Sequence, residues 1–161
     1  MLWAGYISRD GGTRFYDALY TACNEYPPDG EERALVHRAI LVLSDGADTQ
    51  SFHDLQNVIA MAQRAEVQIY TLALHDQKLM SRTDAVLQRL AEQTGGRFYV
   101  AQSSMDLEGI FAQIEQQLRT QYYVSFSPLQ ETPGFHALQV QVRTPQKMTV
   151  HARHGYYAPA Q

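Results

Sequence analysis

The sequence predicts an α/β fold in which a doubly wound, mostly parallel sheet is followed by an antiparallel β-meander. Short continuous apolar runs, typical of parallel strands buried on both faces, alternate with segments whose apolar residues recur at helical spacing. This alternation favours parallel pairing with right-handed crossovers. After residue 120, apolar and polar residues alternate singly, as they do in strands with one wet face. We therefore expect an α/β domain over residues 1–120 and a C-terminal β extension, packed on it, over residues 121–161.

The individual elements follow from spacing and from turn signals. Helices are expected at residues 13–26, 55–62, 86–91 and 107–118, and apolar strands at residues 39–43, 67–74 and 97–100. Period-2 strands are expected at residues 122–127, 138–143 and 148–153. Thr13 has the residue type of an N-cap for the first helix, and Asp17 suits its early turns because a carboxylate there stabilises the helix dipole. The glycine pair at residues 95–96 is a good stop for the third helix, and residues 27–30 (PPDG) form a turn after the first.

Length, charge and cysteine content argue against several classes of protein. The chain has 161 residues, which suits one domain, and its net charge of −4 argues against nucleic acid as a partner. The apolar runs fall well short of the roughly 20 residues that a membrane span needs. Cys23 is the only cysteine, so no internal disulfide is possible, and the N-terminal residues do not have the pattern of a signal peptide.

Two oxygen-bearing side chains are expected at one edge of the sheet. Asp45 directly follows the apolar strand at residues 39–43, and Thr13 stands at a helix start after two glycines. Ligands of open parallel sheets bind beyond the carboxyl ends of the strands. A hydroxyl and a carboxylate that meet there suit a hard cation such as Mg²⁺, although two oxygens are too few to hold it without water, other side chains or a partner.

Three segments follow one another along the chain: residues 11–19 (GGTRFYDAL), residues 40–46 (ILVLSDG) and residues 94–99 (TGGRFY). In this order they resemble three segments of the von Willebrand factor type A domains: a glycine–threonine helix start, a strand followed by Ser/Thr-Asp-Gly, and the turn into the last strand. The tail from residue 122 resembles the extension of an acidobacterial-type subgroup, whose members usually look exported.

The resemblance implies a metal-ion-dependent adhesion site that binds Mg²⁺, Mn²⁺ or Ca²⁺ together with an acidic side chain of a protein partner. Thr13 and Asp45 match two of its ligands, and the possible supporting residues are Gly12, Gly46, Asp48 and Ser51. The family's Asp-x-Ser-x-Ser motif does not occur in this sequence. We therefore expect an N-terminally truncated domain with an incomplete site and weak or absent metal binding.

The same truncation would leave the strand at residues 39–43 with an unpaired edge, which is a hazard for association. Residues 1–7, a second copy of the chain or an upstream polypeptide could cover that edge.

Several alternatives stay open at this stage. Asp48 and Ser51 also suit the N-cap region of the following helix, and Asp17 suits a capping carboxylate better than a metal ligand. The six histidines show no convincing ligand spacing. We expect a non-enzymatic binding module with no catalytic residues. One alternative is a hydrolase or phosphoacceptor that uses Asp45. The sequence argues against this alternative because it contains neither a glycine-rich phosphate-binding loop of the P-loop type nor a Gly-x-Ser-x-Gly nucleophile turn. The other alternative is a truncated reading frame with no independent function.

Overall fold

A computed structural model describes residues 12–25, 38–75, 80–122, 124–127, 132–144 and 148–158. Its α/β part consists, in chain order, of α1 (Phe15–Asn24), β1 (Arg38–Leu43), α2 (Leu55–Arg64), β2 (Val67–Leu74), α3 (Arg82–Thr94), β3 (Phe98–Ala101) and α4 (Asp106–Arg119). The predicted α/β class is confirmed. The turn expected at residues 27–30 and the covering segment considered at residues 1–7 lie outside the described residues.

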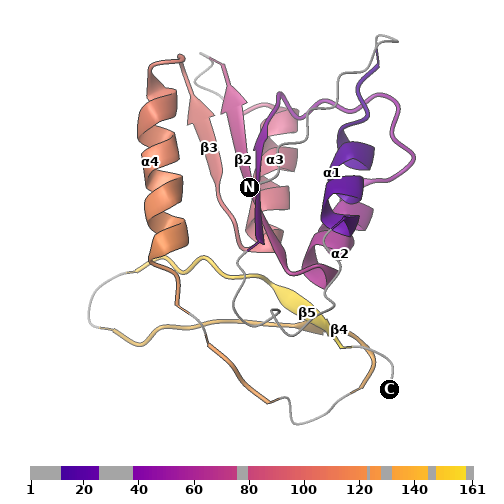
Figure 1. Ribbon diagram of the computed structural model, residues 1–161, viewed down its shortest axis with the longest axis vertical. Coiled ribbons are helices and arrows are strands. Elements are labelled where there is room, and N and C mark those ends of the chain that lie inside the picture. Colours follow the sequence, from indigo (N-terminus) through magenta and orange to yellow (C-terminus); the bar gives the residue numbers. More distant parts are fainter. Residues whose placement is uncertain are drawn as a thin grey trace.

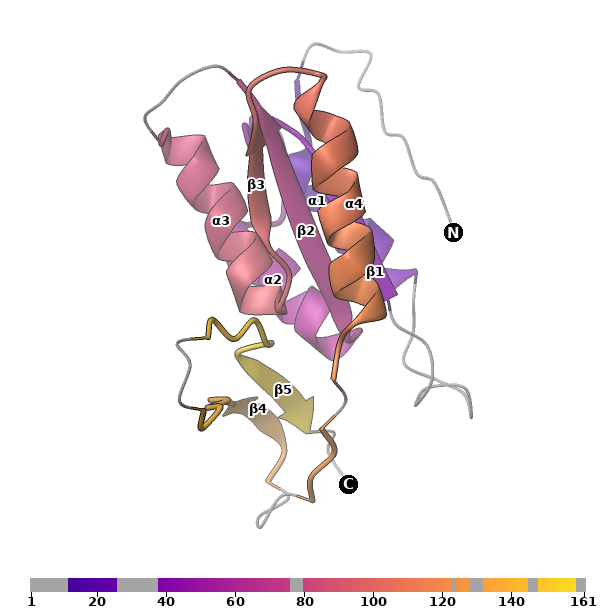
Figure 2. The same cartoon turned by 90° about the vertical axis from the view of Figure 1, so that its left-hand side faces the viewer.

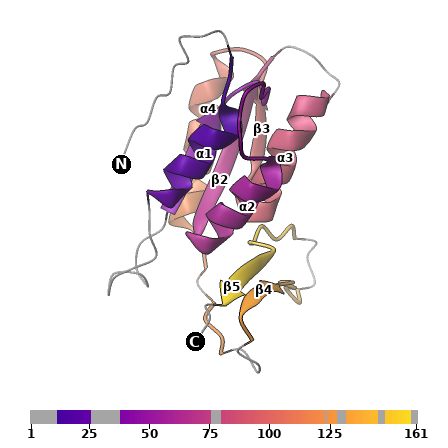
Figure 3. The same cartoon turned by 90° about the vertical axis from the view of Figure 1, so that its right-hand side faces the viewer.

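The described strands of this part form one parallel sheet in the order β1-β2-β3. Figure 3 shows α1, α2 and α3 in front of the strands and α4 behind them, and Figure 2 shows the sheet from the α4 side. A larger apolar cluster fills the layer between the sheet and α1–α3, with Leu87 and Leu90 fully buried in it. A smaller cluster, which includes Tyr70 and Tyr99, lies under α4. Both faces of β2 are therefore covered, which explains why its residues from Ile69 to Ala73 are all buried.

The helix ends differ in how their free backbone groups are satisfied. Reciprocal capping boxes begin α2, through Asp54 and Asn57, and α3, through Ser81 and Asp84. Gly95 ends α3 in the left-handed conformation, as predicted from the glycine pair. The first turn of α1 has no such local cap, because its N-cap residue is Arg14 and makes no side-chain capping bond. No helix in the described part of the chain combines the length and apolar character needed to cross a membrane.

The described residues of the C-terminal region contain one short antiparallel pair, β4 (Gly134–Ala137) with β5 (Gly155–Ala158). The predicted antiparallel character of this region is confirmed, but the predicted three strands are wrong: the described residues of 122–127, 138–143 and 148–153 are not strands. The apolar side chains of these segments are largely exposed, with Tyr122 at 95% and Val124 at 80%. Alternation alone does not produce a sheet when no layer packs against its apolar face, because burial supplies the stabilising free energy.

The extension packs on the end of the α/β layers where the strands begin (Figure 1). The guanidinium of Arg64 at the end of α2 lies 4.5 Å from the centroid of the Tyr157 ring, and Gln93 of α3 bonds His154 at 2.8 Å. The α/β part and the extension also approach each other at Gly95, where an added Cβ would lie 2.7 Å from the backbone nitrogen of Arg153. The positive φ of 83° at Gly95 adds a second reason for glycine at this position.

Substitution of Gly95 by Ala should lower the free energy of unfolding by about 1–2 kcal/mol, because it combines left-handed strain with a backbone clash. Urea denaturation would measure the loss, and limited proteolysis would detect loosening of the extension. Gly109→Ala is the matched control, because a Cβ there meets nothing within 4 Å inside α4. The control should be neutral or stabilising by up to about 1 kcal/mol. Equal stability of the two variants would contradict this account of Gly95.

Candidate functional site at the carboxyl edge of the sheet

The loop after β1 turns sharply at the carboxyl edge of the sheet. The Ser44 N–H donates to the carbonyl of Leu72 and so extends the β1–β2 ladder by one residue. The Ser44 hydroxyl then accepts the N–H of Gly46, and a carboxylate oxygen of Asp45 accepts the N–H of Ala47, both at 3.0 Å. These side-chain turns fold the loop back on itself and leave Asp45 exposed at the edge.

Gly46 is a structural requirement of this turn. It has a φ of +74°, and a Cβ there would lie 2.9 Å from the carbonyl of Thr83 in α3. Only glycine combines this conformation with so close an approach to a helix backbone. Gly46 therefore acts by shaping the loop that carries Asp45.

Thr13 lies against the same loop. Its N–H donates to the hydroxyl of Thr49 at 2.9 Å, and its carbonyl accepts the N–H groups of Thr49 and Gln50. Gly12 is buried beside this junction, and a Cβ on it would overlap the side chain of Gln50. The Thr13 side chain is exposed, and no described residue hydrogen-bonds its hydroxyl. The two predicted ligand residues therefore belong to segments joined to each other at one edge of the sheet.

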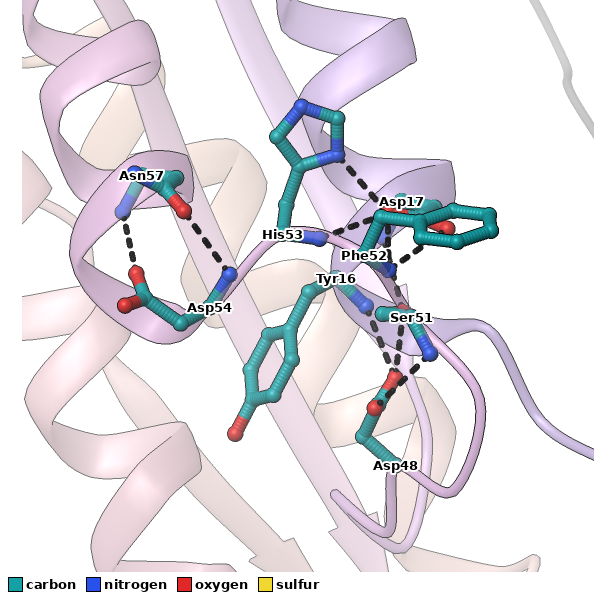
Figure 4. A network of polar contacts seen from close by, with 8 residues as sticks. All are labelled: Tyr16, Asp17, Asp48, Ser51, Phe52, His53, Asp54 and Asn57. Carbon is teal, nitrogen blue, oxygen red and sulfur yellow. Dashed lines mark hydrogen bonds and ion pairs between the residues drawn. The ribbon is translucent and has the colours of Figure 1, made fainter.

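The loop also caps α1 from outside, as Figure 4 shows. A carboxylate oxygen of Asp48 accepts the N–H of Tyr16 at 3.2 Å, and the hydroxyl of Ser51 accepts the N–H of Asp17 at 3.0 Å. Asp48 also accepts the Ser51 hydroxyl, which fixes the two capping groups relative to each other. Two free donors in the first turn of α1 are thus satisfied by residues more than 30 positions away in sequence.

The side chain of Asp17 makes the reciprocal contacts, from α1 to the loop. Its carboxylate accepts the N–H groups of Phe52 and His53 and the Nδ1–H of the His53 ring, which lies 2.7 Å away. The His53 ring stacks on Tyr20 with 3.8 Å between centroids. Burial opposes ionisation of Asp17, but the hydrogen bonds from His53 and Phe52 outweigh it and lower the pKa of the carboxyl group. We call this set of contacts between residues 16–20 and 48–53 the α1 clasp.

The α1 clasp corrects two sequence-based assignments. Thr13 is not the N-cap of α1; that position is Arg14, and the capping oxygens come from the loop. Asp48 and Ser51 cap α1 and not the following helix, whose N-cap is Asp54. The interpretation of Asp17 as a capping carboxylate agrees with its contacts, although the groups it caps are in another segment. Sequence spacing cannot reveal capping between distant segments, because each residue type is equally suited to a local turn.

A second carboxylate–imidazole pair lies at the same edge, after β2. His75 Nε2 lies 3.0 Å from Asp84, which is almost fully buried and also accepts the N–H of Ser81. Burial raises the pKa of Asp84, but the bonds from Ser81 and His75 outweigh it, so the net pKa is lowered. The pair ties the end of β2 to the start of α3. Sequence reasoning missed it, although the spacing of Ser81 and Asp84 is that of a capping box and could have indicated it.

The chemistry available at this edge is that of oxygen ligands. Asp48 and Ser51 are engaged by α1, whereas Thr13 and Asp45 keep exposed oxygens. Within the described ranges, no group of three or more His, Cys, Asp or Glu side chains is placed to hold a metal ion. A cation bound here would therefore need oxygens from water or from a partner in addition to these two side chains.

A parallel α/β sheet with a glycine-shaped loop and a threonine-bearing helix start at its carboxyl edge defines a class of open-sheet binding domain. Residues 5–113 match the von Willebrand factor type A domain, and the chain belongs to that family.

Among solved structures, the chain is similar to an uncharacterized membrane-spanning protein from Vibrio fischeri. The sequence identity is 23% and the TM-score 0.47; the match covers 53% of this chain and 48% of that one. The chain thus spans about half the length of that protein. No curated protein matches this chain.

Asp17→Asn should lower the free energy of unfolding by roughly 1–2 kcal/mol at neutral pH, because the carboxylate accepts three donors of the α1 clasp. The folded pKa of Asp17 lies below its ordinary value of 3.8, so its stabilising effect is complete above that pH. The effect is lost as the pH falls through the folded value. Urea denaturation of both proteins in a series of buffers from neutral pH into the acid range below 3.8 would measure it. If the difference in the free energy of unfolding between the two proteins does not shrink in acid, this role of the Asp17 carboxylate is contradicted.

Proposed function

We propose that this chain is a non-catalytic protein-interaction module whose carboxyl sheet edge supplies part of a metal-ion-dependent adhesion site. Membership of the von Willebrand factor type A family supports an interaction role. The observation that carries the finer proposal is the junction of the helix start at Thr13 with the loop that bears Asp45. In this proposal the two side chains contribute a hydroxyl and a carboxylate to Mg²⁺, or to Mn²⁺ or Ca²⁺, and an acidic side chain of the partner supplies a further oxygen.

The donor set fits such a cation only in part. Hydroxyl and carboxylate oxygens are suitable ligands for a hard cation, and both side chains are exposed. The possible supporting ligands Asp48 and Ser51 already hold the first turn of α1, so recruiting them would break the α1 clasp. We therefore propose that Thr13 and Asp45 are the contributing residues, that Gly12 and Gly46 shape their segments, and that affinity for the free ion is weak.

The proposal also includes a protein-docking role for the outer edge of β1. The ladder contact of Ser44 with β2 directs the backbone groups of even-numbered β1 residues toward β2 and those of Ala39, Leu41 and Leu43 outward. Leu41 and Leu43 are also 45% and 58% exposed on the α4 side of the sheet. No strand of the described residues pairs with this outer edge of β1. An edge with apolar side chains next to it is suited to receive a strand from a second copy of the chain or from an upstream segment.

Titration calorimetry of the chain with MgCl₂ and MnCl₂ should show no saturation below roughly millimolar concentration, because two protein oxygens leave most of the coordination shell to water. Asp45→Asn should abolish whatever heat remains. Glu115→Gln is a control that removes one exposed carboxylate on α4. A micromolar dissociation constant for the unmodified chain would contradict the incomplete-site proposal, and an unchanged isotherm for Asp45→Asn would remove Asp45 from it.

Leu41→Lys should weaken self-association in sedimentation velocity by roughly tenfold in dissociation constant, because a charge beside an exposed strand edge opposes pairing. Phe111→Lys is the matched control, since it changes an apolar side chain of similar exposure (44%) on α4. Concentration-dependent association that both variants weaken equally would contradict a docking role for the β1 edge. A chain that stays monomeric at all concentrations would exclude the second copy as the occupant and leave the upstream segment.

A further inference from the structure

A surface hollow of about 490 Å³ lies between the end of β3 and the first half of α4, on the opposite edge of the sheet from β1. Its lining combines apolar and polar groups of both elements: Val100, Met105, Ile110, Gln102, Asp106 and Gln113, with Gly109 between them. Met105 is 88% exposed and Val100 39% exposed, so the hollow opens to solvent beside an apolar rim.

The backbone of β3 faces this hollow with unpaired groups. The carbonyl of Arg97 accepts the N–H of Thr71 in β2, and the carbonyl of Ala101 accepts the N–H of His75 directly after β2. Neighbouring strand residues point their backbone groups to opposite sides. The N–H and carbonyl groups of Phe98 and Val100 are therefore directed away from β2. No described strand pairs with β3 on that side. The wall of the hollow formed by Val100 can thus accept the backbone of another extended chain.

Gly109 enlarges the hollow at a cost to the helix. It lies in the middle of α4, where glycine is less favourable than alanine by about 1 kcal/mol. A Cβ at this position would meet nothing within 4 Å, so neither packing nor a positive φ explains the glycine. The open space beside it is large enough for a side chain of another molecule.

Asp106 is the one charged residue among those that line the hollow, and one oxygen of its carboxylate accepts the N–H groups of Gln102 and Ser103 at 2.9 Å. Asp106 and Glu108 are in the first turn of α4, and both are exposed. The only basic residue of α4 is Arg119 in its last turn, where it pairs with Glu115 at 2.8 Å. The end of α4 that borders the hollow is therefore acidic and complements a basic ligand.

We propose that this hollow binds an extended basic peptide, which pairs with the outer edge of β3, places one apolar side chain beside Gly109 and directs a basic side chain toward Asp106 and Glu108. Strand addition to an open edge provides backbone hydrogen bonds, and the hollow and the acidic helix end provide selectivity for side chains. The occupant is a peptide segment of another protein with alternating apolar and basic residues. This site is separate from the cation site and from the β1 edge, so it can fail or hold independently of the proposed function.

The test uses the full chain and two fluorescein-labelled seven-residue peptides, one alternating valine with lysine and one alternating valine with glutamate. Fluorescence polarisation should show binding of the lysine peptide at roughly 10–100 μM and binding of the glutamate peptide at least tenfold weaker. Amide hydrogen exchange at Val100 should slow when the lysine peptide is bound.

Two variants and a control separate the groove from general attraction to an acidic protein. Gly109→Leu fills the hollow without changing charge and should weaken binding at least tenfold, while Gly109→Ala should bind within about threefold of the original. Val100→Pro removes one outward N–H and should also weaken binding; urea denaturation checks that both variants stay folded. Retention of binding by a folded Gly109→Leu variant, equal affinity for both peptides, or no binding up to about 1 mM would overturn the proposal.

Discussion

The first turn of α1 has no capping side chain of its own, so its free N–H groups depend on the loop that follows β1. Asp48 and Ser51 accept two of these donors, and Asp17 in turn accepts backbone donors of Phe52 and His53. Each segment therefore supplies the partners that the other lacks, and neither arrangement is complete without the other. The position of Thr13 relative to Asp45 rests on this exchange, because both residues flank it directly.

This exchange of hydrogen bonds uses the side chains of Asp48 and Ser51, whereas the side chains of Thr13 and Asp45 remain exposed. The loop uses one carboxylate and one hydroxyl to hold the helix and leaves Asp45 in a local turn at the rim of the sheet. Hydrogen bonds of the Thr13 backbone to Thr49 and Gln50 attach the residue before this helix start to the same loop. The pair formed by His75 and Asp84 fixes the adjacent strand end to α3 in the same manner. The carboxyl edge is thus ordered by carboxylates that accept hydrogen bonds, with pKa values lowered as a result.

The described sheet has three strands and is open at both edges, and the two edges differ. Beside β1 the exposed side chains are apolar and project from the sheet, as at Leu41 and Leu43. Beside β3 the exposed backbone adjoins a hollow with an acidic helix end. The two backbone edges therefore differ in the chemistry of the side chains beside them. Described residues of the extension contact the ends of α2 and α3, through Tyr157 and His154.

The sequence by itself determined the α/β class, the extents of β1 and β2, and the stop of α3 at Gly95. These features depend on periodicity and on the conformational freedom of glycine, which are properties of neighbouring residues. It also indicated that Thr13 and Asp45 lie toward the same edge of a parallel sheet, from strand and helix order alone.

Only the tertiary structure decided which helix Asp48 and Ser51 cap, and that Asp17 binds the backbone of Phe52 and His53. It also decided that the described residues of the alternating tail form a single short strand pair. Capping groups are chosen by distance in space, and a strand forms only where a partner strand and a packing layer exist. Neither condition is encoded in the residues immediately before and after a position, and both depend on how the whole chain is folded.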